Sequence, residues 1–201
     1  MWTRTAAISI AVAFVGGYAA DASAQDSPWQ FRIGSTSIKP KSNNSPVVNV
    51  DDNSSLTFTI SYYFGDNWAF EVLAAVPFEH DIELLDGTVV GDTEHLPPTF
   101  TIQYHFLPNG RFRPYAGLGI NYTTFTSEST TGPLAGSDLS LDASTGLAIQ
   151  LGADFMINDN WLINVDLRSI DIESDAELDG SPLTTVAIDP SVFGINVGYR
   201  F

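Results

Sequence analysis

Three arginines and three acids recur among the small and polar residues of otherwise apolar segments of this chain. They are Arg32, Arg168, Arg200, Glu71, Asp154 and Asp166. Buried charges are tolerated when they are paired and hydrogen-bonded, so we expect these six side chains to pair by sign within one enclosed space. Paired across a narrow interior, such a set would form a polar plug rather than a pore.

Three histidines are the other candidates for chemistry. His80 and His95 flank an acidic segment at 78–96, where a metal site is conceivable, but an exposed acidic loop is the favoured interpretation. His105 shares a face with Gln103, and we interpret it as a hydrogen-bonded residue rather than a catalytic base. Serine, histidine and aspartate show no nucleophile-elbow pattern, and cysteine is absent. The sequence therefore predicts no enzyme, no metal centre and no cofactor.

The elements that must position these residues are β-strands, because apolar and polar residues alternate with a period of two. In the clearest case, Leu56, Phe58 and Ile60 oppose serine and threonine neighbours. Eight segments follow this pattern: 29–36, 55–64, 68–77, 99–106, 115–124, 146–155, 161–168 and 193–201. We expect the last strand to pair with 161–168 and 29–36, since an unpaired edge would promote aggregation.

The connections alternate in length, as expected for an antiparallel up-and-down meander. Those at 65–67, 107–111 and 158–160 are short, whereas those near 37–54, 78–96, 126–142 and 172–189 are long. Short periplasmic turns opposite four long extracellular loops are typical of an eight-stranded transmembrane β-barrel. This all-β fold would occupy residues 25–201.

Residues 1–24 have the features of a secretory signal peptide. Arg4 precedes an apolar stretch at 6–15, and Ala22-Ser23-Ala24 forms a small-residue cleavage site. No later apolar run is long enough for a membrane helix, so membrane residence would require a closed barrel.

Alternation alone does not decide which face is outside, and a lipocalin-like barrel would place the apolar face inside. An eight-stranded interior is too narrow for so many bulky side chains, and the charges pair best in a lumen. Aromatic residues also gather at the short-turn end, as in an interfacial girdle. This girdle comprises Trp29, Phe64, Trp68, Phe106, Phe155, Trp161, Tyr199 and Phe201.

Less polar residues are expected on the inward face above the plug, on the side of the long loops. Leu73, Ala75, Pro77 and Tyr115 could line a hydrophobic pathway, or they could simply pack beneath the loops. Proline lacks the N–H that a ladder needs, so Pro77, with Pro97 beginning the partner strand, could leave a sideways opening.

The formal net charge of the chain is −16, and most of the acids fall in the long connections. This charge disfavours nucleic-acid binding. The acidic loops could contact divalent cations that bridge surface lipid, or they could be a solvated loop surface, which is the favoured interpretation.

Six segments of the chain resemble the outer membrane protein W (OmpW) family, which includes AlkL-type alkane importers. They are 74–80 (with Val76 where the family has threonine), 96–99, 103–106, 112–125, 137–141 and 189–201. The resemblance covers the mature chain in order. It implies an eight-stranded barrel in the outer membrane of a Gram-negative bacterium, with a narrow hydrophobic channel that releases small apolar molecules sideways.

The partners implied are outer-membrane lipid and lipopolysaccharide, small apolar solutes and, through the aromatic last strand, the barrel-assembly machinery. The resemblance does not identify the transported molecule. The alternative function is a structural or surface-interaction protein without transport, whose acidic loops bind lipid, host or phage.

Overall fold

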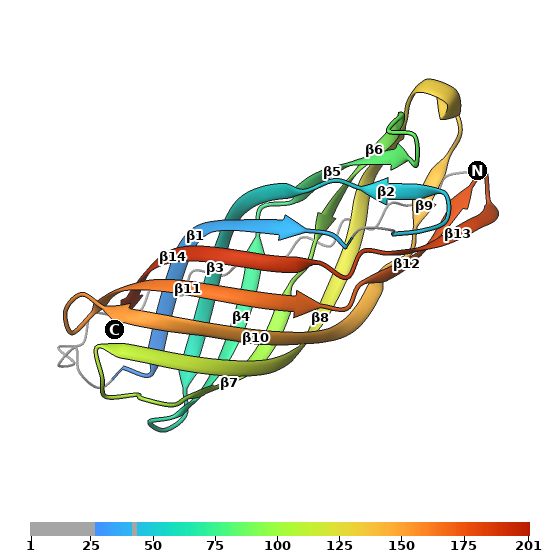
Figure 1. The fold of residues 1–201 in the computed structure, drawn as a ribbon. Helices are drawn as coiled ribbons and strands as arrows, with labels where there is room; N and C mark the ends of the chain where they lie inside the picture. Colours follow the sequence, from blue (N-terminus) through green and yellow to red (C-terminus); the bar gives the residue numbers. More distant parts are fainter. Residues whose placement is uncertain (1–26, 42–43) are drawn as a thin grey trace, which may run out of the picture.

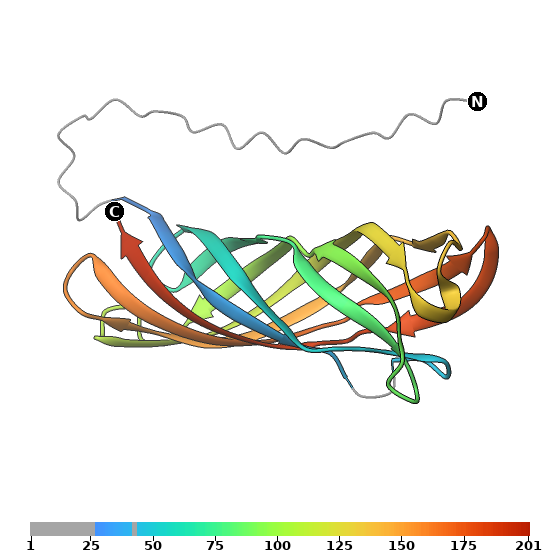
Figure 2. The ribbon, with the colours of Figure 1, turned by 90° about the horizontal axis from the view of Figure 1, so that it is seen from above.

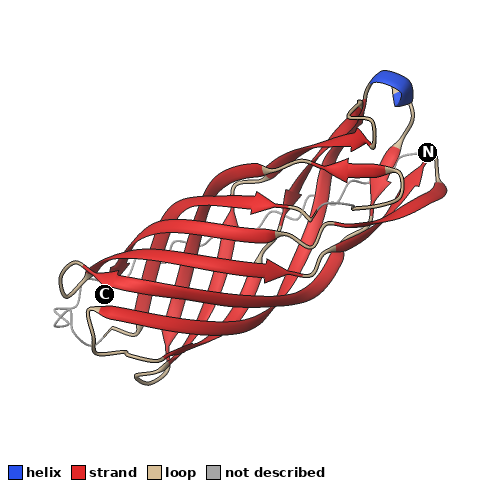
Figure 3. Ribbon diagram, in the orientation of Figure 1, coloured by secondary structure: helices blue, strands red, loops and turns tan. Residues whose placement is uncertain are grey.

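The computed structural model describes residues 27–41 and 44–201, so the predicted signal peptide lies outside the described residues. Eight long strands build the molecule (Figures 1 and 3). They are β1 (Trp29–Lys39), β3 (Asn53–Tyr63), β4 (Trp68–Ala75), β7 (Thr99–His105), β8 (Phe112–Thr130), β10 (Ser144–Met156), β11 (Trp161–Ile170) and β14 (Ser191–Arg200). Each corresponds to one segment predicted from the alternation.

The eight strands close into an antiparallel barrel. Their order is β10-β11-β14-β1-β3-β4-β7-β8, and an additional β8–β10 pairing completes the circle. The last strand pairs with β11 on one edge and with β1 on the other, where Phe31 faces Tyr199. The predicted closure of the eight strands is therefore confirmed.

The apolar face of each strand points outward. Leu118 and Leu147 are 62% and 61% exposed, whereas Arg32 and Glu71 are 0% exposed. A water-soluble barrel would reverse this arrangement, so the exterior suits hydrocarbon rather than water. In the described residues, no helix is long and apolar enough to cross a membrane.

The four long connections contain strands that the alternation did not predict. They are β2 (Val48–Val50), β5 (Phe78–Leu84), β6 (Val89–Leu96), β9 (Leu139–Leu141), β12 (Glu173–Leu178) and β13 (Ser181–Ala187), together with a short 3₁₀ turn, η1 (Gly132–Leu134). The outer part of β8 carries β6, β5 and β2 as a continuation of the wall, and β13-β12-β9 form a second sheet. Figure 2 shows the β12–β13 hairpin and the carboxyl end of β14 at opposite ends of the barrel.

The apolar core lies in the outer half of the molecule, beneath the long connections. Phe78, Ile82, Ile172 and Ile188 belong to one cluster of buried hydrophobic side chains. The inner half is instead filled by polar and charged side chains. The molecule therefore has a polar interior near its short turns and an apolar interior under its long connections.

Candidate functional site: a charged plug below an apolar cavity

Arg32 links opposite walls of the inner half. Its Nη1 donates to Glu71 Oε2 at 2.6 Å and its Nη2 donates to Asp154 Oδ2 at 3.1 Å. These residues come from β1, β4 and β10, which the alternation places inward. The two contacts cross the lumen.

Arg168 makes a second set of ion pairs. Its Nη2 donates to Glu71 Oε1 at 2.9 Å, and its Nε donates to Asp166 Oδ1 at 3.0 Å. Glu71 therefore accepts from one arginine on each oxygen. Ser61 Oγ and Gln150 Nε2 add hydrogen bonds to the same carboxylate, each at 3.2 Å.

Neutral side chains fill the space around the charges. Asn164 Nδ2 donates to Asp154 Oδ1 at 2.8 Å and lies 3.0 Å from the Tyr115 hydroxyl oxygen. Gln103 Nε2 donates to Gln150 Oε1 at 2.9 Å. An eight-stranded barrel is just wide enough for its side chains to fill, and this network fills the inner half of the lumen. The structure thus brings together five of the six predicted plug residues.

Arg200 does not join the ion pairs, contrary to expectation. Its guanidinium carbon lies 4.1 Å from the centre of the Tyr63 ring, and within the described residues it forms no ion pair with a carboxylate. It lines a cavity of about 680 Å³ at the short-turn mouth with Arg111 and Arg113. The reason is its position along the barrel axis: Arg200 is the last residue of β14 and lies at the short-turn rim, beyond the ion pairs.

The predicted upper-lumen position of Tyr115 is wrong. Tyr115 pairs with His105 near the short-turn end, and the Arg32 guanidinium carbon lies 5.4 Å from its ring centre. Tyr115 lies near the start of β8, which follows a short turn. An inward residue at that point of a strand must lie near the short-turn end of the barrel. Tyr115 is therefore part of the plug.

The wall above the plug is interrupted between two neighbouring pairs of strands. The β4–β7 ladder ends where Leu73 faces Thr99, and pairing resumes only where Phe78 of β5 faces His95 of β6. Pro77 and Pro97 lie in the intervening segments. Leu73 and Pro97 are buried and Ala75 is half-buried, whereas Pro77 is exposed rather than turned into the lumen.

A small cavity of about 30 Å³ lies above the interruption, between the β2-β5-β6-β8 wall and the β9-β12-β13 sheet. Val48, Phe125, Val186 and Ile188 contribute apolar side chains to its lining. His80 and His95 also line it, and each is only 2% exposed. The interpretation of these histidines as parts of an exposed acidic loop is therefore wrong.

The two imidazoles stack face to face. Their ring centres are 4.9 Å apart, and the Phe78 ring also stacks with His95, at 5.4 Å. Burial, with the neighbouring His80, lowers the pKa of His95 to about 3, so this ring is neutral at ordinary pH. Alternation could have revealed the inward direction of both histidines only if β5 and β6 had been recognised as strands.

Acidic side chains outside the barrel gather at Asp171, Glu173 and Asp189, whose carboxylate oxygens lie within 4.8 Å of one another. The Lys41 ammonium group already contacts Asp189. These residues are exposed or half-buried at the surface, away from the plug and the cavity.

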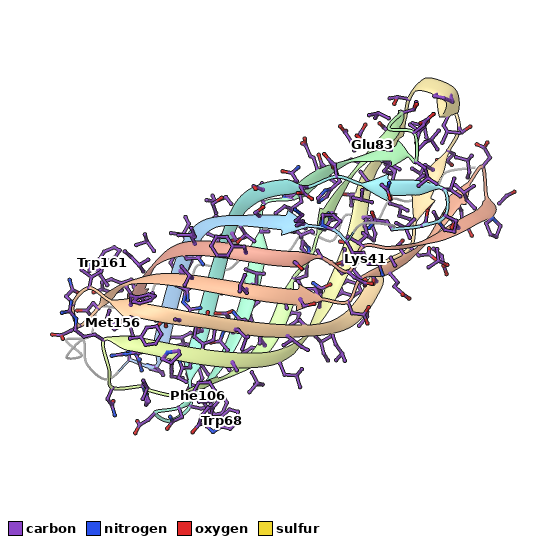
Figure 4. All side chains as sticks on the ribbon, in the orientation of Figure 1. Lys41, Trp68, Glu83, Phe106, Met156 and Trp161 are labelled. Atoms are coloured by element: carbon purple, nitrogen blue, oxygen red, sulfur yellow. The ribbon has the colours of Figure 1, made fainter. Side chains whose placement is uncertain are left out.

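Aromatic side chains form a belt at the short-turn end, where Figure 4 labels Trp68, Phe106 and Trp161. The tryptophan rings pair edge to face across strands, Trp29 with Tyr62, Trp68 with Tyr104 and Trp161 with Tyr199, at 4.9 to 5.0 Å. The remaining predicted members Phe64, Phe155 and Phe201 are 45% to 50% exposed. Such a belt is typical of a membrane interface.

A barrel that exposes its large apolar side chains, buries its ion pairs and carries an aromatic belt is a transmembrane β-barrel of the bacterial outer membrane. Within that class, the chain belongs to the OmpW family, which it matches over residues 27–201.

Individual relatives agree with this assignment. Outer membrane protein W of Vibrio cholerae is 43% identical over 195 residues, covering 88% of this chain and 90% of the relative. The dibenzothiophene metabolism operon protein PahQ of Pseudomonas aeruginosa is 28% identical over 194 residues, covering 89% and 90%. The crystal structure of OprG from Pseudomonas aeruginosa superposes with a TM-score of 0.76 at 32% identity, covering 86% of this chain and 95% of that one. The protein is thus an outer-membrane protein of the Gram-negative type.

Proposed function

We propose that the protein is a passive channel through which small apolar molecules cross the outer surface of the cell and leave sideways into the membrane. The observation that carries this proposal is the interruption of strand pairing directly above a closed plug. A solute that enters from outside would meet charged side chains below it and an unpaired stretch of wall beside it.

The plug supports a sideways rather than an axial exit. Glu71 and Arg32 are fully buried, and Glu71 is held by both paired arginines. An apolar solute that moved down the axis would have to separate these charges without replacing their partners, which is unfavourable. The route through the wall has no such cost.

The composition of the interruption supports an opening there. Residues 74–77 on one side and 96–98 on the other contain Pro77, Pro97 and Pro98, none of which has a backbone N–H to donate. The flanking side chains Leu73 and Ala75 are apolar. The wall can therefore separate at this point with little loss of hydrogen bonding.

The likeness to PahQ favours a fused-ring aromatic compound as a test solute, because that relative is named for dibenzothiophene metabolism. Uptake of naphthalene into lipid vesicles that contain the protein would test the channel, with protein-free vesicles as the reference. We expect faster uptake with the protein, and equal rates would contradict transport.

A substitution tests the sideways exit itself. Pro77→Val adds a backbone N–H that can pair across the interruption, so we expect it to slow uptake several-fold at an unchanged amount of folded protein in the vesicles. Pro108→Val, in a short turn at the other end of the barrel, is the matched control and should have no effect. Unchanged uptake with Pro77→Val would refute the exit while leaving transport intact.

The alternative function, surface interaction without transport, would rest on the acidic outer residues, including Asp171, Glu173 and Asp189. They would contact lipopolysaccharide through divalent cations, or a host or phage surface. A correctly folded barrel that gives no uptake, together with transfer of a binding activity when the long connections are grafted onto another barrel, would favour this alternative.

A further inference from the structure

We propose that the outer cavity selects neutral apolar molecules that carry a hydroxyl group, such as alcohols and phenols, by hydrogen bonding to the stacked pair His80 and His95. The inference rests on the proposed channel function and specifies which apolar molecules are preferred. Its basis is a pair of imidazoles in a lining that, apart from Thr93 and Ser174, is apolar.

The hydrogen bonding of His80 leaves one ring nitrogen free. Its Nδ1 lies 2.8 Å from the backbone carbonyl oxygen of Asp51, which can only accept, so Nδ1 carries the proton. The other nitrogen, Nε2, is then an acceptor. It is buried and has no partner among the residues that the structure describes.

A buried acceptor without a partner is unfavourable, and native proteins rarely keep one without a reason. A ligand hydroxyl that donates to His80 Nε2 would satisfy it. The free protein therefore holds a polar group whose missing partner a ligand can supply.

His95 adds the complementary capacity. Its ring lies against that of His80 with an angle of 22° between the planes. A neutral imidazole offers one donor and one acceptor. A hydroxyl group, which both donates and accepts, matches the pair better than an ether or ketone oxygen, which only accepts.

Charge excludes the ionic alternatives. The lining around the histidines includes Val48, Ile82, Phe125 and Val186, so a carboxylate or an ammonium group would lose its hydration without a counter-charge. The net charge of −16 further opposes anions. A neutral hydroxyl on an apolar body is the class that remains.

The ligand must open the cavity to enter, because about 30 Å³ holds no more than a single water molecule. The two sheets that enclose the cavity are separate, with no strand ladder joining them. Asn44 bridges them, because it exchanges hydrogen bonds with Ala187 of β13 at 2.9 and 3.0 Å and its Oδ1 accepts from Val50 N–H of β2 at 3.0 Å. The sheets can therefore part by breaking these few bonds, without breaking a ladder.

The test compares 1-naphthol with naphthalene, which share a ring system and differ by one hydroxyl group. Binding of each to the full barrel in lipid nanodiscs is measured for the wild type and for His80→Phe, which keeps a stacked ring and removes the acceptor. Empty nanodiscs correct for partition into lipid. The preference is the affinity for 1-naphthol divided by the affinity for naphthalene. We expect this ratio to be about fivefold higher in the wild type than in His80→Phe, which is the usual effect of one hydrogen bond.

Thr93→Val is the matched control, since Thr93 lines the cavity but its hydroxyl already donates to backbone oxygens. It should keep the preference. The same ratio in the wild type and in His80→Phe would overturn the hydroxyl inference alone, whereas failure of both probes to bind would count against the channel as well.

A second measurement needs no variant. In the ¹⁵N spectrum of the wild type, 1-naphthol should shift the His80 Nε2 resonance, and naphthalene should leave it unchanged. Equal responses to the two probes would overturn the inference even if His80→Phe does not fold.

Discussion

Arg32 Nη1 and Glu71 Oε2 lie 2.6 Å apart in the middle of the barrel, and neither side chain is exposed. Glu71 is also bound by Arg168, so two arginines depend on one carboxylate. The pair therefore joins β1 to β4, and Arg168 brings in β11. The interior of the inner half behaves as one hydrogen-bonded unit.

Glu71→Gln should destabilise the barrel strongly. Removing one partner of a buried ion pair leaves uncompensated charge, which typically costs about 3–5 kcal/mol. Urea unfolding of the protein in lipid vesicles, followed by tryptophan fluorescence, measures the change. Asp159→Asn, in a short turn at the surface, is the control and should change the unfolding free energy little; a similar small effect for Glu71→Gln would contradict the role of the plug.

Gly152→Leu should disturb the plug through packing rather than charge. A Cβ atom at Gly152 would lie 2.4 Å from the Tyr115 ring, which covers this glycine from the neighbouring strand. We expect a loss of about 1–3 kcal/mol in the unfolding free energy, as is usual for overpacking. If the double variant Gly152→Leu/Tyr115→Ala is no more stable than Gly152→Leu alone, the clash is not the cause.

In protein prepared without residues 1–24, the predicted signal peptide, the remaining tryptophans should report a single depth in the bilayer. They are Trp29, Trp68 and Trp161, and all three lie at the short-turn end. Lipids brominated near the headgroup should quench their fluorescence more than lipids brominated at the chain ends, because aromatic belts lie at the interface. Stronger quenching from the bilayer centre would contradict the girdle.

Acid should loosen the outer sheets. The pKa of His95 falls from 6.5 to about 3 on burial, so the unfolded region takes up a proton below pH 6.5 that the folded region does not. Stability is therefore full above pH 6.5 and decreases as the pH falls toward 3, by up to about 4 kcal/mol. Hydrogen exchange of β5 and β6 against pH measures this loss, and His95→Phe should flatten the dependence; an equal slope in that variant would show another group to be responsible.

The outward direction of the apolar face had to be inferred from the narrow interior, the pairing of charges and the aromatic girdle, but the periodicity of the sequence was sufficient to predict the eight barrel strands and their closure. The signal is local, because an alternating segment needs no knowledge of its partner. The same alternation placed Arg32, Glu71, Asp154, Asp166 and Arg168 inward. Pairing by sign followed from the cost of burying a charge alone.

The position of each inward residue along the barrel axis was harder to predict. Arg200 and Tyr115 were both assigned to the correct face, yet one lies below the ion pairs and the other among them. This position depends on strand tilt and on the register with both neighbours, which no single segment encodes.

The sequence by itself thus determined that this is an outer-membrane barrel of the OmpW family with charges inside and aromatic rings at one end. The sequence also indicated a break in the ladder near Pro77. Only the tertiary structure decided that the long connections fold into two sheets, that His80 and His95 stack between them, and that the unpaired stretch extends from Leu73 to Phe78. These features depend on hydrogen bonds and contacts between segments far apart in the chain. Their partners are chosen by closure of the whole barrel rather than by any local pattern.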